Sequence, residues 1–222
     1  MTLDNNSSRP PLTGWQRNLV LFVDRRILTL TRRWLTLFNV LLGAYVLLPV
    51  LAPVLMANGA PAIGRLIYIA YGPACHQLPE RSFFLFGSRA TYTLDEFRAL
   101  GLLQDAGILE RKLFLGNDQL GYKTAFCQRD LAFYGGLWIG GLLFGLVRKR
   151  IKPLPLLAYG LCLLPMAIDG GTQLLMFRES NWTLRLFTGG LAGIASVWML
   201  YPHLEAAFSE VRSHAQRQVS KA

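Results

Sequence analysis

Four stretches of the chain are apolar over about 20 residues or more, the length that a helix needs to cross a hydrocarbon core about 30 Å thick. Inside that core the backbone must satisfy its own hydrogen bonds, so each stretch is predicted to be a transmembrane helix. The sequence therefore predicts an all-α fold, a polytopic membrane helical bundle with about four spans. The predicted spans are Trp34–Met56, Ala125–Val147, Leu154–Met176 and Leu184–Phe208.

The region between the first two spans is predicted to be partly helical. Ala62–Ala74 is too short to cross a bilayer, so we expect a re-entrant or interfacial helix there. In the loop 78–124, Thr93 and Glu96 have the spacing of a capping box, and a second short helix is expected over about Ile108–Leu115. This loop is predicted to form a small helical cap on the extracytoplasmic side of the bundle.

The distribution of basic residues predicts the orientation of the chain. Its formal net charge is +10, and the excess is concentrated in segments 1–33, 148–152 and 209–222. By the positive-inside rule, we expect a multi-pass protein of the cell (plasma) membrane with both termini cytoplasmic. Segment 1–33 is amphipathic and either lies on anionic headgroups or is the solvated start of the first helix, 34–208 is the membrane domain, and 209–222 is a basic tail. Because topology explains the charge, no nucleic-acid partner is predicted.

Polar residues enter the predicted spans near one end of each. An ionisable group inside a bilayer is costly, so each one is a functional candidate. Asp169 and Gln173 share one face of the third span, and Cys127 and Asp130 share a face at the start of the second. The topology derived from charge places these groups on the extracytoplasmic side. The sequence thus predicts one outward-facing site, formed by Cys75, His76, Arg81, Cys127, Arg129, Asp130, Asp169, Gln173, Arg178, Glu179, Ser180 and Arg185.

The same residues carry a family resemblance. The motifs are Cys75-His76-Gln77 with Arg81-Ser82-Phe83, Cys127-Gln128-Arg129-Asp130, Asp169-Gly170 with Gln173, and Arg178-Glu179-Ser180 before Arg185 and Thr188-Gly189. In this order they resemble the predicted membrane proteins catalogued as domain of unknown function 2085. The resemblance extends from about Trp34 to Phe208. It implies a polytopic prokaryotic membrane protein, and it implies no particular reaction.

A metal site is one hypothesis for this chemistry. Cys75, His76 and Cys127, together with Asp130 or Asp169, offer the mixture of sulfur, nitrogen and oxygen ligands that suits zinc. The spacing matches no regular zinc motif. An alternative is a disulfide between Cys75 and Cys127, since the extracytoplasmic side is oxidising. A redox-active dithiol is a third possibility.

Four arginines indicate a second kind of site. Guanidinium groups bind phosphate and carboxylate groups bidentately, and at a bilayer boundary the natural anion is an anionic lipid or polyprenyl-phosphate headgroup. Gln173, Glu179 and Ser180 are predicted to complete this ligand-binding set. The alternative is a structural ionic network in which acids neutralise the arginines. The arginines are Arg81, Arg129, Arg178 and Arg185, and the acids are Glu80, Asp130, Asp169 and Glu179.

The leading hypothesis is a metal- or anion-binding site that acts on a lipid-linked or small anionic ligand beside the lipid bilayer. Whether the protein is an enzyme stays open. If it is one, hydrolysis is the most natural reaction, with Asp130 or Asp169 as base or metal ligand and His76 as ligand or proton carrier. The alternatives are a transporter component, with Asp169 and Gln173 lining a pathway, and a structural subunit of a membrane complex. Glycine stripes such as Gly136-x-x-x-Gly140 also suit a homo-oligomer.

Overall fold

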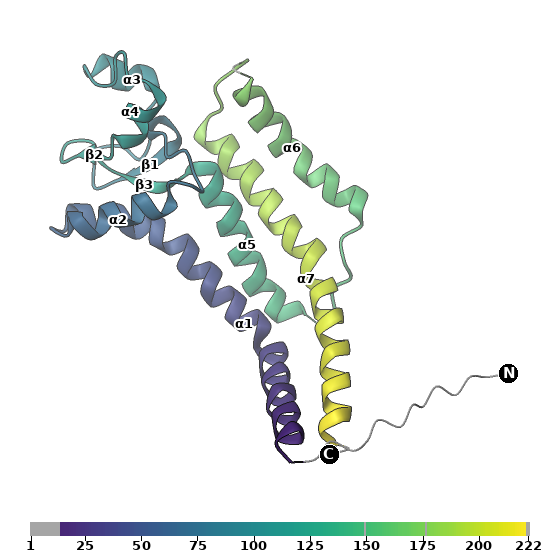
Figure 1. Cartoon of the computed structure of the whole chain (residues 1–222). Coiled ribbons are helices and arrows are strands. Elements are labelled where there is room, and N and C mark those ends of the chain that lie inside the picture. The colour runs from purple at the N-terminus through teal and green to yellow at the C-terminus, as the bar shows by residue number, and fades with distance from the viewer. Residues whose placement is uncertain (1–13, 149, 176, 221–222) are drawn as a thin grey trace. The chain divides into compact units, whose positions relative to one another are not determined.

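The computed structural model describes residues 14–148, 150–175 and 177–220, which are mostly helical with one small sheet (Figure 1). The chain divides into two compact units, which we call the terminal unit (residues up to Thr36 and from Leu204) and the central unit (Leu37–His203). The elements in chain order are α1 (Trp15–Ala57), α2 (Pro61–Tyr71), the 3-10 turn η1 (Pro79–Arg81), β1 (Ser82–Leu85), α3 (Leu94–Ala99), α4 (Ile108–Leu113), β2 (Gly116–Asn117), β3 (Gly121–Cys127), α5 (Gln128–Val147), α6 (Leu156–Leu174) and α7 (Trp182–Ser220).

Three helices among the described residues, α1, α5 and α7, are long and apolar enough to cross a membrane. They coincide with the first, second and fourth predicted spans, which confirms a mostly helical protein with candidate membrane-spanning helices. The third predicted span corresponds to α6, whose last turns carry the polar run from Asp169 to Gln173 and are therefore less apolar. The predicted end of that span, Met176, lies outside the described residues.

The amphipathic N-terminal segment and the first span are one helix. Because the sequence has no glycine or proline between Trp15 and Leu42, the helix passes residue 33 without a break; α1 runs for 43 residues in all and contains Pro49 and Pro53 in its second half. At a rise of 1.5 Å per residue this corresponds to roughly 65 Å. Similarly, α7 runs for 39 residues and passes the predicted end of its span at Phe208. The boundaries expected after residues 33 and 208 therefore lie inside these two helices, near the limits of the terminal unit at Thr36 and Leu204.

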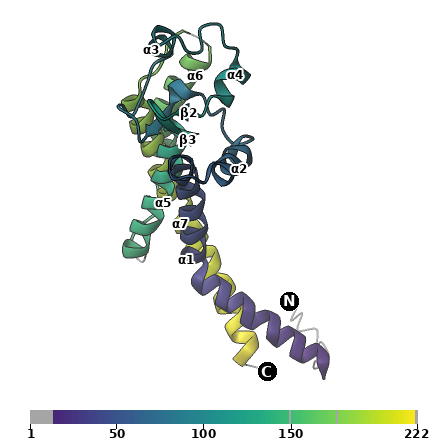
Figure 2. The same ribbon diagram turned by 90° about the vertical axis from the view of Figure 1, so that its left-hand side faces the viewer.

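In the terminal unit, the start of α1 lies beside the end of α7 (Figures 1 and 2). The indole nitrogen of Trp34 donates a hydrogen bond of 2.8 Å to Glu205, and the rings of Trp34 and Phe208 have centroids 5.3 Å apart. Arg212 donates to Glu205 at 2.7 Å and to the carbonyl of Thr31 at 2.8 Å. The first and last helical segments of the chain are thus paired with each other.

In the central unit, α5 packs closely on α7 through glycines. A Cβ at Gly136 would lie 2.7 Å from the carbonyl oxygen of Gly190, and a Cβ at Gly189 would lie 2.7 Å from the carbonyl oxygen of Arg129. Both are far shorter than an ordinary carbon–oxygen contact, so these positions require glycine. The predicted stripe of small residues therefore packs helices within the chain, and it brings the start of α5 against the start of α7.

The loop 78–124 contains a small sheet as well as the two expected helices. The prediction of a purely helical cap is therefore incomplete. The capping box of Thr93 and Glu96 is formed at the start of α3, and α4 occupies the expected place. The sheet has three antiparallel strands in the order β1-β3-β2, with Ser82 opposite Cys127.

The third strand also corrects the start of the second span. Residues 125–127 were expected to be helical, but they are the end of β3, so the helix begins at Gln128. The side chains of Ala125 and Phe126 are fully buried, and Phe126 contacts the aromatic rings of Tyr71 and Tyr134. The strand therefore enters an aromatic core of the central unit and ends where α5 begins. This strand-to-helix junction positions the candidate site.

Candidate functional site

Cys127 lies at the junction of β3 and α5. It is the N-cap of the helix, and its sulfur accepts a hydrogen bond of 3.5 Å from the backbone N–H of Asp130. The next residue, Gln128, is buried and donates 3.0 Å to the carbonyl of Ser82 on the paired strand. The start of β1 is thereby attached to the start of α5.

Cys75 is presented by a turn after α2. Gln77 has a positive φ of 52°, a conformation that is unfavourable for a residue other than glycine. Its buried side-chain amide donates to the carbonyls of Tyr68 at 2.9 Å and Ala125 at 3.0 Å, which offsets this cost. The Cys75 sulfur accepts hydrogen bonds from the backbone N–H groups of Gln77 at 3.4 Å and Cys127 at 3.2 Å. The turn therefore fixes this sulfur beside the N-cap of α5.

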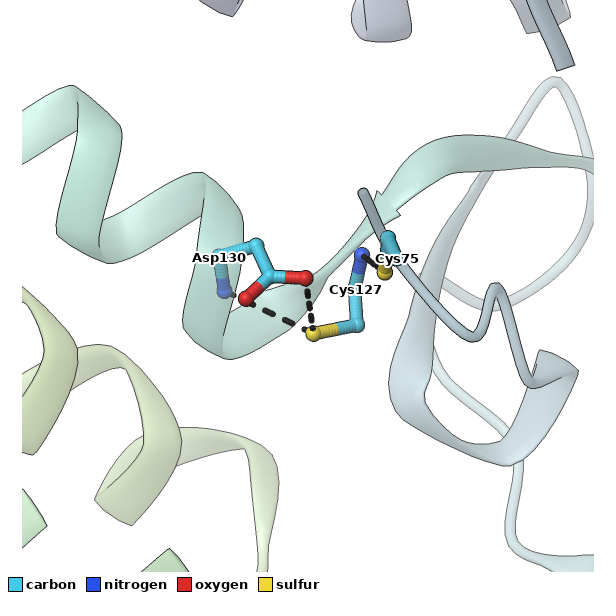
Figure 3. Close-up of side chains that lie close together, drawn as sticks. All are labelled: Cys75, Cys127 and Asp130. Atoms are coloured by element: carbon cyan, nitrogen blue, oxygen red, sulfur yellow. Dashed lines mark hydrogen bonds between the residues drawn. The ribbon is translucent and has the colours of Figure 1, made fainter. Parts of the chain in front are cut away.

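The two cysteines and Asp130 form a cluster (Figure 3). Their ligand atoms all lie within 4.8 Å of one another, and the Cys127 thiol donates 3.1 Å to Asp130. Both cysteines are free thiols. The contact with Cys75, burial and the nearby Asp130 carboxylate raise the pKa of Cys127 well above its ordinary value. The structure thus brings together two of the three predicted metal ligands with one of the predicted acids.

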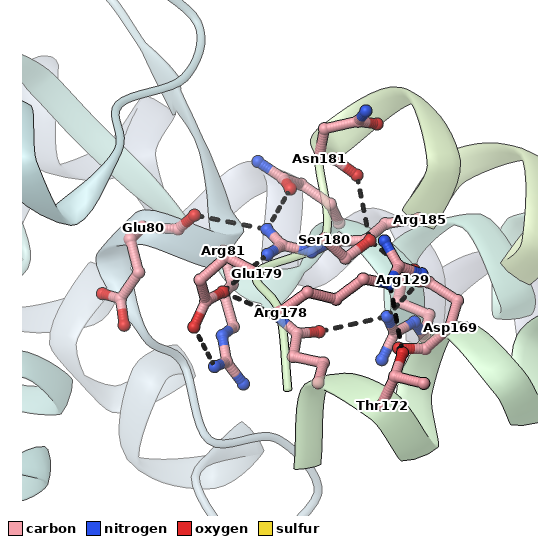
Figure 4. Close-up of polar contacts among 12 residues, drawn as sticks. Glu80, Arg81, Arg129, Asp169, Thr172, Arg178, Glu179, Ser180, Asn181 and Arg185 are labelled. Atoms are coloured by element: carbon pink, nitrogen blue, oxygen red, sulfur yellow. Dashed lines mark hydrogen bonds and ion pairs between the residues drawn. The ribbon is translucent and has the colours of Figure 1, made fainter. Parts of the chain in front are cut away.

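Asp169 is the centre of a second cluster, at the end of α6 (Figure 4). Its carboxylate is 2% exposed and accepts hydrogen bonds from three side chains. Arg178 donates at 2.7 Å and Ser180 at 2.9 Å, and Arg129 forms a short ion pair with the same group. With this many donors, Asp169 is held in its ionised form and orients two guanidinium groups.

Gln173 and Glu179 extend this network. Gln173 accepts 3.1 Å from Arg129 and donates 2.8 Å to Glu179. Glu179 forms ion pairs of 3.2 Å with Arg81 and 3.5 Å with Arg185. Its side chain is 70% exposed, so solvent screens both pairs and they contribute little energy.

Arg185 is buried at the start of α7, with 4% of its surface exposed. It donates 2.9 Å to the side chain of Gln128 and 3.3 Å to the carbonyl of Glu80. The Glu80 carboxylate is not its partner, because Arg111 binds that group at 2.8 Å. The four arginines are therefore not neutralised by four acids. In the described chain, Asp169 and Glu179 are the carboxylates that form ion pairs with the four arginines.

A cavity of about 240 Å³ lies between the two clusters. It is lined by predicted site residues from four segments of the chain: Cys75, His76, Arg81, Cys127, Arg129, Asp130, Gln173 and Arg185. Asp169, Arg178, Glu179 and Ser180 do not line it, but they support the lining residues through the hydrogen bonds described above. His76 is exposed at the cavity and is not part of the cysteine cluster.

Two residues of the candidate site were not among the predicted site residues. Gln77 lines the cavity and holds the Cys75 turn, and Gln128 binds Arg185. Both are within the quoted motifs. The signal that could have identified them is an amide side chain in a motif that is otherwise charged or sulfur-bearing, since a buried amide can bridge backbone carbonyls and guanidinium groups.

Comparison with known proteins gives a family but no structural relative. A family profile described as a predicted membrane protein, domain of unknown function 2085, matches residues 109–199. An uncharacterized protein of Methanocaldococcus jannaschii is 30% identical over 138 residues, which cover 61% of this chain and 67% of that protein. No solved structure matches the chain.

Proposed function

Because the chain belongs to the family of predicted membrane proteins catalogued as domain of unknown function 2085, we propose that it binds, from within a lipid bilayer, the phosphate group of a lipid-linked or small anionic ligand. The single observation that carries this proposal is Arg185. A buried guanidinium lines a cavity, and its one ion pair in the described chain is a 3.5 Å contact to an exposed carboxylate. A buried charge of this kind requires an anion.

The proposed topology has four spans, which are α1, α5, α6 and α7 in chain order. The start of α1 and the end of α7 are paired through Trp34, Glu205 and Arg212, so both chain ends belong on the same side of the membrane. An even number of crossings satisfies this condition, and α1, α5 and α7 alone would give an odd number. With 19 residues, α6 is about 28 Å long, close to the thickness of a hydrocarbon core.

The proposed location of the cavity is the extracytoplasmic side of the plasma membrane. Lysine and arginine are concentrated in the first part of α1, in the connection between α5 and α6, and in the last part of α7, which favours the cytoplasm for both termini. Cys75 and Cys127 lie on the loop that follows one crossing, and Asp169 and Arg178 lie around the turn that follows three. Both groups then face the side opposite the termini.

The charge around the cavity supports an anionic ligand. Arg81, Arg129 and Arg185 line it, whereas Asp130 is the one carboxylate among its described lining residues. The Nε atoms of these arginines are also buried without a hydrogen-bond partner in the described chain. A phosphate accepts several charge-assisted hydrogen bonds from such groups and would balance the excess positive charge.

The size of the cavity favours a headgroup over a whole lipid. Its volume of about 240 Å³ is below the range of roughly 300–1,000 Å³ that is usual for drug-sized ligands. A phosphate group with its first attached atoms fits this space, and the lipid chains of such a ligand would remain in the bilayer. In this proposal Asp169, Glu179 and Ser180 position the arginines rather than touch the ligand.

Hydrolysis of the bound group is the second candidate function. Asp130 lines the cavity and forms no ion pair in the described part of the chain, so its carboxylate is free to serve as base or metal ligand. His76, exposed at the same cavity, would carry the proton. Asp169 is a poorer base, because its three donors stabilise the unprotonated form.

The test measures phosphate binding to the full chain in detergent after treatment with a chelator. We expect inorganic phosphate to bind by calorimetry, and Arg81→Gln to weaken binding about tenfold, or ~1.4 kcal/mol. Arg98→Gln is the control, since Arg98 is an exposed residue of α3 paired with Asp95. Nanodiscs with and without phosphatidic acid then separate a lipid headgroup from free phosphate. If neither probe binds, or if both variants bind equally, the arginines form only a structural network.

A further inference from the structure

We infer that Cys75, Cys127 and Asp130 bind one zinc ion at the wall of the cavity. Two sulfurs and a carboxylate within 4.8 Å of one another form a donor set that suits a borderline-soft divalent cation. Zinc bonds of about 2.0–2.3 Å place neighbouring ligands of a tetrahedral site about 3.3–3.8 Å apart. Cys127 and Asp130 are already in contact at 3.1 Å, and the more distant ligand atoms need to approach by about 1–1.5 Å at most.

The backbone already holds these ligands. The Cys75 sulfur accepts two backbone N–H bonds, and the Cys127 sulfur accepts one at the first turn of α5, a helix of 20 residues. In the metal-free protein the Cys127 thiol keeps its proton and donates it to Asp130, so zinc would bind with release of this proton. Each ligand comes from a fixed position: a turn closed by Gln77, an N-cap, and the first helical turn. Little conformational entropy would be lost on binding.

The charge of a zinc site also complements its surroundings. Zinc with two thiolates and a carboxylate carries one net negative charge. Arg81, Arg129 and Arg185 line the same cavity, so the loaded site would face guanidinium groups rather than other anions. The three crowded donors would in turn be neutralised by the cation.

The fourth coordination position faces the cavity, because all three ligand residues line it. A water molecule or the exposed His76 can occupy that position. An open position beside an anion pocket is the arrangement of catalytic rather than structural zinc sites. The zinc site uses atoms other than those of the arginine pocket, so it stands independently of the proposed phosphate binding.

The experiment uses the full chain purified in detergent with a phosphine reductant and loaded with Zn²⁺ or Co²⁺ alone. We expect one metal ion per chain by elemental analysis and a sulfur-to-cobalt charge-transfer absorption band. Asp130→Asn should weaken metal binding at least tenfold, and Cys75→Ser should abolish the band. Cys162→Ser is the matched control, since Cys162 lies within α6 outside the cluster, and it should bind as the wild type does.

A second preparation, purified without any reductant, tests the competing disulfide. Thiols are counted in denaturant before and after reduction. Three thiols without reduction, with stoichiometric metal, support the zinc site; one thiol without reduction, and no metal after reduction, would overturn it in favour of a Cys75–Cys127 bond. Asp130→Asn keeps both cysteines, so it remains informative if Cys75→Ser fails to fold. Phosphate binding is measured on chelator-treated protein, so the failure of either proposal leaves the other standing.

Discussion

Two ion-pair clusters in this protein differ in how the charge of their arginines is balanced. In the terminal unit, Arg212 pairs with Glu205 and donates to the carbonyl of Thr31, and Trp34 also donates to Glu205. In the central unit, four arginines share Asp169 and the exposed Glu179, and three of the four line a cavity. The first arrangement holds two helices together. The second has excess positive charge beside a cavity, which is the property expected of an anion-binding site.

The largest expected effect is on stability, and it is seen when one carboxylate is removed from each cluster and the two losses are compared. Asp169→Asn leaves Arg129 and Arg178 without their buried counter-charge, and we expect it to lower the free energy of unfolding by about 3–5 kcal/mol. Glu205→Gln is the matched change in the terminal unit. Because Glu205 and Arg212 are each about one-fifth exposed, we expect a loss of about 1–2 kcal/mol there.

Thermal or denaturant unfolding in the same detergent, followed by circular dichroism, measures both losses. Added phosphate extends the comparison. Bound anion should raise the free energy of unfolding of the wild type, and it should raise that of Glu205→Gln by the same amount. Equal losses in the two variants would show that Asp169 belongs to an ordinary structural ion pair.

The second expected effect concerns Lys123, another buried cation of the central unit. Its ammonium donates to the carbonyls of Gln77 at 2.5 Å and Lys112 at 2.7 Å, and its side chain is fully buried in the sheet. Burial lowers the pKa of Lys123 to about 7. The unfolded chain, with the ordinary value of 10.5, therefore holds more protons between these two pH values.

Stability should consequently rise as the pH increases from about 7 towards 10, by at most about 1.4 kcal/mol per pH unit from this one group. Below pH 7 the cost of burying the charge is fully present. Lys123→Met removes the titrating group, so the difference in unfolding free energy between wild type and variant should change with pH in this window. A difference that is flat with pH would show that Lys123 stays charged when folded.

Much of the fold follows from local sequence patterns. The long apolar runs predict α1, α5 and α7, and the spacing of Thr93 and Glu96 predicts the start of α3. The sheet was missed because the apolar end of β3, residues 125–127, was assigned to the following span, although the polar residues 128–130 separate it from the apolar part of α5. The pairing of Ser82 with Cys127, which is remote in sequence, distinguishes this strand from the helix.

The sequence could predict which residues form the site, but it could not predict which of them pair with one another. Charge-derived topology placed Cys75, Cys127 and Asp130 at one level, and the structure brings their ligand atoms together. The sequence could not show that Glu80 binds Arg111, because Arg111 lies in the cap helix α4 and the two are brought together by tertiary folding. This pairing of Glu80, together with the absence of an ion pair at Asp130 in the described chain, leaves two carboxylates for the four arginines.

The smallest expected effect tests whether the arginine geometry, rather than charge alone, binds the anion. A Cβ at Gly170 would lie 3.2 Å from Nη1 of Arg129, so Gly170→Ala must displace this guanidinium by a few tenths of an ångström. The neighbouring Gly171 has open space around the same position, which makes Gly171→Ala a control with identical composition. Both changes replace glycine by alanine within α6, so both should stabilise the helix by up to about 1 kcal/mol.

We therefore expect Gly170→Ala to weaken phosphate binding about two- to fivefold, an effect of ~0.4–1 kcal/mol, while Gly171→Ala keeps the affinity of the wild type. The charge of the cavity is the same in all three proteins, so any difference reports on the position of Arg129. Unchanged affinity in both variants would mean that long-range attraction alone holds the anion. The contrast between the two ion-pair clusters would then rest on net charge and not on a preorganised arrangement of guanidinium groups.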